Sequence, residues 1–175
     1  MRLSPPVPVR LETTDPWRQY VASLAAAAGL RHDPRAEVVL HVTDLPDDCA
    51  SADRWVVDSR PHLTVVAVPR GVRIGPFVVP GLTACLRCVR AGSDAAGGPR
   101  PRGVDLVPGP GVDAALLALA LGWAARDTRT WLGDGTPSTW SATVTVGVDL
   151  SPRVRRWQRH PHCGCSWGCS WGEAV

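Results

Sequence analysis

Two closely spaced cysteine pairs are the residues of this sequence whose types and spacing could do chemistry. Two residues separate Cys85 from Cys88, and a single glycine separates Cys163 from Cys165. Either spacing can place two thiolates on one tight turn, which is how zinc knuckles present their ligands. The fold can bring two such pairs together to form a closed tetrahedral shell. The pattern therefore predicts a structural Zn²⁺ ion bound by Cys85, Cys88, Cys163 and Cys165.

The sequence alone leaves other uses of the six cysteines open. A lone C-x-x-C is also typical of redox proteins, where it follows a strand early in a βαβ unit. The fourth ligand could instead be Cys169 or His162. Cys49 stands apart from both pairs and is interpreted as a small buried side chain. The role of Cys169 is left unassigned.

No catalytic residue and no nucleotide-binding residue is predicted. All 19 basic residues are arginine, so mechanisms that need a lysine, such as a P-loop or a Schiff base, are excluded. No G-x-G-x-x-G motif is present to hold a phosphate group at a helix N-terminus. Asp58, Ser59 and His62 include the side chains of a catalytic triad, but they crowd on one short segment, unlike a working triad.

Composition restricts the class of protein. The 175 residues suffice for one domain, and a hydrophobic content of 45% excludes wholesale disorder. The net charge of +3 is small and the arginines are scattered, so no nucleic-acid partner is expected. No signal peptide and no apolar window of membrane-spanning length is visible, so a cytoplasmic protein without a membrane partner is expected. In that compartment, paired cysteines favour metal binding over disulfides.

Hydrophobic periodicity predicts the elements that must position these cysteines. An extended arm of 14 residues with an edge strand comes first, and a helix begins at Asp15-Pro16 and ends near Gly29. The segment from Asp44 to Arg54 could be a loop or a short helix. Apolar runs predict three buried strands and a hairpin after them: 37–42, 55–57 as the weakest, 62–68, and 70–74 for the hairpin.

The second half of the chain is predicted to contain a mobile loop, one helix and two strands. The loop at 91–110 is rich in glycine, proline and alanine. A buried or interface helix of about 15 residues follows within 111–131. Residues 140–150 alternate as in a half-buried strand, and 153–157 could pair with it. Trp167 and Trp171 in the tail either dock a partner or cover the zinc knuckle.

The segment Gly75-Pro-Phe-Val-Val-Pro-Gly81, followed by Cys85-Leu-Arg-Cys88, resembles the ThiF-like superfamily of ubiquitin-activating-type adenylating proteins. The branch it resembles is found in gene clusters for azole-modified, ribosomally made peptides. In that branch this segment leads into the first zinc cysteine pair. The second pair lies near the C-terminus, as it does in His160-Pro-His-Cys-Gly-Cys165. The resemblance covers about residues 37–166.

The resemblance implies an α/β fold, namely a partial Rossmann-like ThiF-type domain with a mixed sheet and flanking helices, closed by a structural zinc knuckle. It also divides the chain into an N-terminal arm and helix (1–36) and a truncated ThiF-like domain (37–175), together forming one compact unit. The family's nucleotide loop and lysine are missing, so the ATP-binding half is expected to be absent. Asp44 follows the first strand of the matching region, where the family has a magnesium-binding aspartate, but a turn is the favoured interpretation.

Three functions are compatible with the resemblance. The first is a non-catalytic accessory protein that binds the leader of a precursor peptide, a YcaO-type cyclodehydratase, or both. The second is half of a split adenylating enzyme that another chain completes, with Asp44 or the arginines of 90–102 serving the nucleotide. The third is a zinc-stabilised dimerisation module, with a homodimer interface on helix 112–125. Many relatives hold the leader with a separate winged-helix-like domain, which residues 1–36 cannot form. A peptide would therefore pair with an exposed edge strand, at 7–11 or at 144–150.

Overall fold

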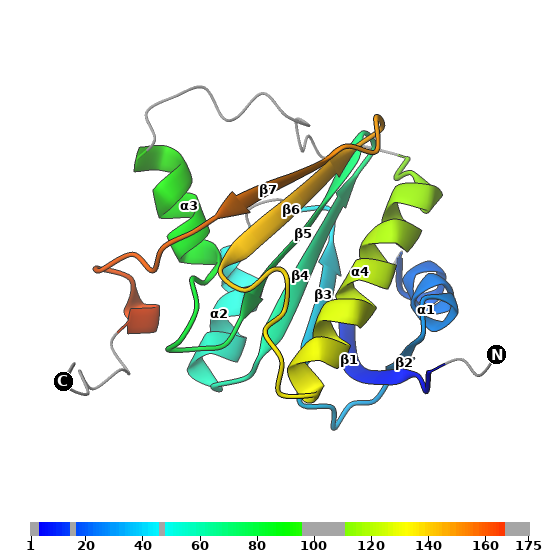
Figure 1. Ribbon diagram of the computed structural model, residues 1–175, viewed down its shortest axis with the longest axis horizontal. Coiled ribbons are helices and arrows are strands. Elements are labelled where there is room, and N and C mark those ends of the chain that lie inside the picture. Colours follow the sequence, from blue (N-terminus) through cyan, green and yellow to red (C-terminus); the bar gives the residue numbers. More distant parts are fainter. Residues whose placement is uncertain (1–3, 15–16, 46–47, 96–110, 167–175) are drawn as a thin grey trace.

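The computed structural model of the chain describes residues 4–14, 17–45, 48–95 and 111–166, which form a mixed β-sheet with helices on both faces (Figure 1). The elements in chain order are β1 (Val7–Thr13), α1 (Arg18–Ala27), β2 (Leu30–His32), β3 (Val39–Thr43), α2 (Cys49–Val57), β4 (His62–Val68), β5 (Gly71–Val78), α3 (Leu86–Ala95), α4 (Ala114–Leu132), β6 (Ala142–Gly147), β7 (Pro152–Arg156) and a short 3₁₀ turn (Gly164–Ser166). The predicted mixed sheet with flanking helices is confirmed. Within the described part of the chain, no helix combines the length and the apolar character needed to cross a membrane.

The seven strands lie in the order β2-β1-β3-β4-β5-β6-β7. The first four of these are parallel neighbours, and β5, β6 and β7 are added by antiparallel pairing. The prediction of an edge strand at 7–11 is wrong, because β1 is paired on both sides. Val7 and Val9 pair with β2 and are buried, whereas Arg10 to Thr13 pair with β3. The N-terminal segment is therefore an interior strand of the sheet, next to the edge strand β2.

Helices α1 and α4 cover one face of the sheet and enclose the main hydrophobic core. Asp113 begins α4, because its carboxylate accepts hydrogen bonds from the backbone N–H groups of Ala115 and Leu116 at 2.8 and 3.2 Å. At 19 residues, α4 is longer than predicted. One side of the helix is buried in the core and carries the side chains of Leu116, Leu117, Ala120, Leu121, Ala124 and Ala125. This helix is therefore mainly a core element.

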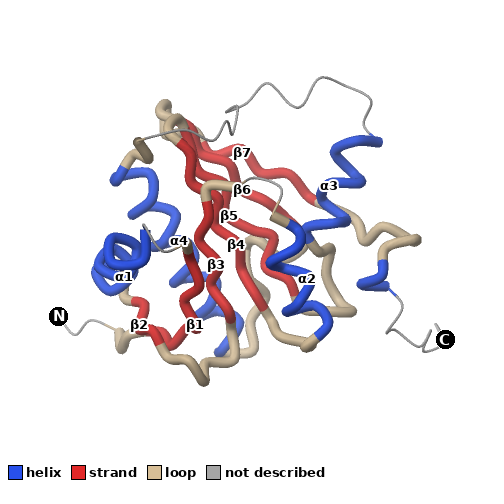
Figure 2. The backbone as a smooth tube through the Cα atoms, turned by 180° about the vertical axis from the view of Figure 1, so that it is seen from behind, coloured by secondary structure: helices blue, strands red, loops and turns tan. Residues whose placement is uncertain are grey.

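Helices α2 and α3 lie on the opposite face of the sheet (Figure 2). The strand predicted at 55–57 is wrong, and the short-helix alternative for the preceding segment is confirmed in part. Cys49, Ala52 and Trp55 recur every three residues and form the buried side of α2. Helix α3 was not predicted, because its glycine and alanine content indicated a loop. Only 96–110 of that predicted loop lies outside the described residues.

Strands β4 and β5 pair antiparallel across the turn at Pro69 and Arg70, so the hairpin predicted at 70–74 is confirmed. Strands β6 and β7 also pair antiparallel, which confirms the predicted pairing of 153–157 with the preceding strand. Strand β6 was predicted to be half-buried, but only Thr145 among its residues is partly exposed. The reason is that its second face is also covered: Trp157, beyond the end of β7, donates its indole N–H to Thr143 Oγ1 at 2.9 Å.

Candidate metal centre

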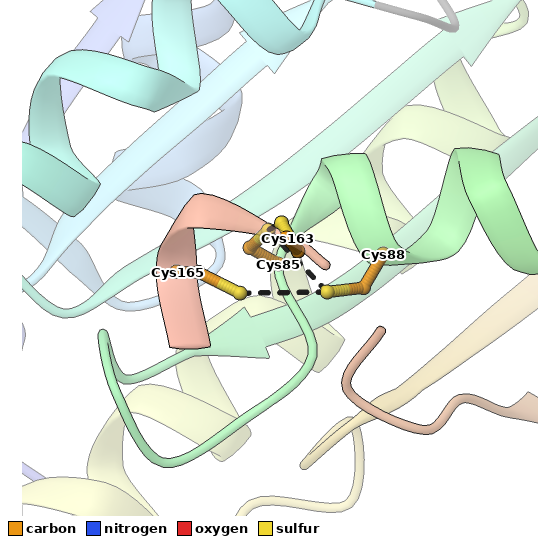
Figure 3. Close-up of side chains that lie close together, drawn as sticks. All are labelled: Cys85, Cys88, Cys163 and Cys165. Atoms are coloured by element: carbon orange, nitrogen blue, oxygen red, sulfur yellow. Dashed lines mark hydrogen bonds between the residues drawn. The ribbon is translucent and has the colours of Figure 1, made fainter. Parts of the chain in front are cut away.

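The four predicted cysteine ligands converge in one buried cluster (Figure 3). The Sγ–Sγ distances are 3.7 Å for Cys85–Cys88, 3.6 Å for Cys85–Cys163 and 3.4 Å for Cys88–Cys165. All four sulfur atoms lie within 4.8 Å of one another, and all four residues are buried. Segments almost 80 positions apart in the chain thus present their thiols to a common point.

The cluster has the dimensions of a tetrahedral metal site. With Zn–S bonds of about 2.3 Å, a regular tetrahedron has sulfur–sulfur edges of about 3.8 Å. These three distances are close to that edge and far above the about 2.05 Å of a disulfide bond. The four cysteines could therefore hold a metal ion. A shell of four thiolates would leave no coordination position for a substrate, as in structural sites.

The first cysteine pair is positioned by the turn that links β5 to α3. Thr83 Oγ1 accepts the backbone N–H of Val79 at 2.8 Å and thereby closes this turn. The N–H of Ala84 then donates to Ser141 Oγ, at 3.0 Å, just before β6. Cys85 immediately precedes α3 and Cys88 lies in its first turn, so both thiols point to one side of the helix start.

Gly75, in the segment that carries the family resemblance, has a structural reason to be glycine. Its φ of +92° lies in the left-handed region, and an added Cβ would approach the carbonyl oxygen of Ala142 to 2.5 Å. A glycine therefore lets β5 approach the neighbouring strand closely. The resemblance motif thus includes a residue that shapes the sheet next to the cysteine turn.

The second cysteine pair is positioned by the chain that leaves β7. Trp157 continues the pairing with β6 by donating its backbone N–H to the Ser141 carbonyl at 2.7 Å. The N–H of His160 then donates to Cys88 Sγ at 3.2 Å, and its carbonyl accepts the N–H of Cys163 at 3.0 Å. The turn at His160 therefore contacts both cysteine pairs.

Trp157 also ties the end of β7 to α3. A Cβ built on Gly92 of α3 would lie 3.3 Å from the Trp157 ring, so the absence of a side chain there lets the indole pack on the helix. The guanidinium of Arg155 lies 4.0 Å from the centre of the same ring, within cation–π range. The helix that carries the first cysteine pair and the segment that carries the second thus share one aromatic contact.

The electrostatics of the cluster match a site for a cation. The neighbouring Cys85 thiol, assisted by the His160 N–H, lowers the pKa of Cys88 to about 4. Burial, together with hydrogen bonds to the Cys163 and Cys88 thiols, raises the pKa of Cys165 to about 11. The hydrogen bond with Cys88, followed by burial, also raises the pKa of Cys85. Four adjacent thiols cannot all ionise by themselves, whereas a bound divalent cation deprotonates coordinating thiols.

The remaining candidates from the sequence fall in other places. Cys49 packs among Val39, Ala52, Trp55 and Leu86, as expected of a core thiol. His62 is buried and its Nδ1 lies 2.9 Å from the Arg60 carbonyl, whereas Asp58 and Ser59 are exposed. Asp44 lies in a bend directly after β3, where Leu45 N–H donates to Thr43 Oγ1 at 3.1 Å. Cys169, Trp167 and Trp171 lie outside the described residues.

Sequence reasoning did not identify the residues that position the two cysteine pairs. Ser141 adopts a positive φ of 46° and accepts a hydrogen bond from a residue 57 positions away, which no local pattern indicates. The contact between Gly92 and Trp157 also joins distant segments. The one available signal was the position of Trp157, directly between a strand and the second cysteine pair.

No protein-family model and no curated protein matches the sequence. Solved structures do match its fold. The heterocyclase TruD superposes with a TM-score of 0.64 and 20% identity over 92% of this chain, and a heterocyclase in complex with substrate and cofactor gives 0.64 and 16% over the same share. MccB of E. coli gives a TM-score of 0.58 and 18% identity over 77% of the chain. This chain shares their fold.

The chain spans 27% of TruD, 25% of the second heterocyclase and 40% of MccB. The 92% match to TruD is more than residues 37–175 can supply, so the similarity extends into residues 1–36. The shared fold thus also takes in part of residues 1–36, which precede the region of the sequence resemblance at 37–166. Strand β1, in this part, lies within the sheet between β2 and β3.

Proposed function

We propose that this protein is a non-catalytic accessory protein in the biosynthesis of ribosomally made, modified peptides. It acts in the cytoplasm, where it binds the leader part of a precursor peptide and docks on a YcaO-type cyclodehydratase or another modification enzyme. The observation that carries this proposal is the shared fold with TruD and MccB over most of the chain.

The structural neighbours support a peptide as the ligand. TruD is a heterocyclase, and a second heterocyclase was determined with its substrate and cofactor. MccB was determined with MccA, with a modified form of MccA and with ATP. Two different peptide-modification proteins therefore contain a segment with this fold, which favours a role for this chain in the same kind of biosynthesis.

A structural Zn²⁺ ion is part of the proposal. The sulfur–sulfur distances, the burial of all four thiols and the thiolate donor set suit zinc. Bound to Cys85, Cys88, Cys163 and Cys165, the ion would join the start of α3 to the segment after β7. It would supply folding free energy and no chemistry toward a substrate.

The sequence supports a binding role over adenylation. It contains neither a lysine nor a G-x-G-x-x-G loop for a nucleotide phosphate. The proposed domain division, an N-terminal arm and helix (1–36) and a ThiF-like part (37–175), is supported as one compact unit by the pairing of β1 with β3.

The test is a titration of the zinc-loaded protein with the precursor peptide encoded beside its gene, in the absence of ATP. Saturable binding to the leader half, and none to the core half, is the expected result. Binding of neither half, measured on protein shown to be folded and zinc-loaded, would reject the proposal.

An adenylating role is the alternative that one observation favours, because MccB was also determined with ATP. ATP–pyrophosphate exchange distinguishes the two functions. The accessory protein shows no exchange, either alone or with the precursor peptide. Exchange that appears only when a second chain is added would instead support half of a split adenylating enzyme.

A further inference from the structure

Strand β7 forms one edge of the sheet, and no other strand of the described residues pairs with its outer side. Its register with β6 places Trp157 opposite Ser141, and the Trp157 N–H bonds to the Ser141 carbonyl at 2.7 Å. In an antiparallel pair, bonded and non-bonded residues alternate. Arg155 and Arg153 therefore direct their backbone groups toward β6, whereas Val154 and Arg156 direct theirs away from it.

This edge is strongly basic. Residues 149–163 contain four arginines and one aspartate, an excess of three positive charges that equals the net charge of the whole chain. Arg156 is exposed on β7 itself. The single acidic side chain, that of Asp149, lies 3.9 Å from Arg153, and both side chains are more than half exposed. The edge therefore carries positive charge that a partner can neutralise.

The same hairpin exposes apolar side chains at its turn and on β7, and its turn is strained. Val148, Leu150 and Val154 each expose about 60% of their surface. Leu150 also has a φ of +55°, in the left-handed region that is unfavourable for a leucine. Strained, exposed apolar residues of this kind are often retained at binding sites.

We propose that the outer edge of β7 binds an extended acidic peptide segment with interspersed apolar residues, which adds an eighth strand to the sheet. This proposal rests on the function proposed above and locates the peptide on the fold. Backbone groups of Val154 and Arg156 would supply the pairing, and the arginines would supply charge complementarity. A second copy of the chain fits poorly, because two β7 strands would place like charges opposite one another.

This location differs from the one expected from the sequence. The two expected edges, 7–11 and 144–150, lie mainly in β1 and β6, and both of these strands are paired on both sides. The other edge, β2, is only three residues long and pairs with Val7 to Val9 alone. Strand β7 is therefore the longer of the two edges.

The test uses the full chain and a fluorescein-labelled peptide of alternating glutamate and valine, as long as β7. Val154→Pro removes an N–H that points outward, so it should leave the β6–β7 pairing intact and weaken peptide binding about tenfold. Arg156→Glu should weaken peptide binding about tenfold, and Arg156→Gln should weaken it by a smaller factor. Higher salt should weaken binding to the wild type.

A modified peptide keeps the test valid if Val154→Pro fails to fold. N-methylation of every second residue blocks one edge of the peptide and leaves the protein unchanged. Methylation on one alternate set should abolish binding, whereas methylation on the other set should not. Equal binding of both methylated peptides, tighter binding of a lysine–valine peptide, or tighter binding of single-stranded DNA would each overturn the proposal.

The precursor peptide separates this proposal from the proposed function. Weaker binding of the precursor to Arg156→Glu supports the β7 site. If the precursor binds wild type and Arg156→Glu equally well, the β7 site is wrong and the accessory function stands. If the precursor binds neither wild type nor Arg156→Glu, the proposed accessory function is rejected, and the β7 site with it.

Discussion

The contact between Gly92 and Trp157 gives a quantitative prediction for a matched pair of glycine substitutions. Gly92 lies inside α3 and Gly122 inside α4. Replacing a helical glycine with alanine stabilises a helix by about 1 kcal/mol when the site has room. At Gly122, apart from its chain neighbours and the backbone of its own helix, no described atom lies within 4 Å of the added Cβ. Gly122→Ala should therefore raise the free energy of unfolding by that amount.

At Gly92 the same substitution has a destabilising effect that opposes the gain in helix stability. The new Cβ would lie 3.3 and 3.4 Å from two atoms of the Trp157 ring. The ring is held by its indole N–H bond to Thr143 at 2.9 Å and by its backbone N–H bond at 2.7 Å. Overpacking of this kind costs about 1–3 kcal/mol. Gly92→Ala should therefore be neutral to destabilising, and about 1–3 kcal/mol less stable than Gly122→Ala.

Urea unfolding of the zinc-loaded proteins measures this difference, and the rate of zinc transfer to a chelator measures its effect on the cluster. Gly92→Val, with a larger side chain, should displace Trp157 and release zinc faster than the wild type, while Gly122→Ala should release it at the wild-type rate. Equal stabilisation by both alanine variants would refute the inference that Trp157 is fixed against α3.

Four further predictions concern the thiols, a buried histidine and the hairpin tip. Because the pKa values of Cys85 and Cys165 are raised, zinc binding at pH 7 should release at least two protons, as measured by titration calorimetry in buffers of different ionisation enthalpy. Cys88→Ser should abolish soluble expression, whereas Cys49→Ser, outside the cluster, should be mild; equal yields of both would contradict this. Burial lowers the pKa of His62 from 6.5 to about 4, so the unfolded state binds more protons between these values, and stability should fall by about 2 kcal/mol from pH 7 to 5. His62→Gln should lack this contribution of His62 to the pH dependence of stability. The difference between wild type and His62→Gln therefore distinguishes the effect of His62 from the effect of zinc release at low pH. Leu150→Gly should raise the free energy of unfolding by about 1 kcal/mol, because it relieves a positive φ at an exposed side chain.

Local patterns in the sequence were sufficient to predict most strands and the four cysteines that converge. Strands with continuous apolar runs, such as β4, are buried on both faces and are therefore easy to recognise. The spacing within each cysteine pair indicated that both of its thiols lie on one turn, and the structure brings the two pairs together in one cluster. These signals depend on residues that are close together in the sequence, so they can be recognised without a structure.

The predictions were wrong where contacts between distant residues determine the secondary structure. Strand β1 looked like an edge because prolines precede it and because it contains Arg10 and Glu12, yet β2 and β3 pair with it on either side. Helix α3 looked like a loop because Gly92 lowers its helical propensity, and only the Trp157 contact explains that glycine. Trp55 looked like a strand residue, but it lies in α2 and its ring packs near His41 and His62.

Titration of the zinc-loaded protein with the leader half of its precursor peptide, without ATP, tests the central claim most directly. We expect saturable binding that is lost when a chelator removes the metal and restored when zinc is returned. Failure of the folded, zinc-loaded protein to bind the leader, or binding that requires ATP, would contradict the proposed leader-binding function.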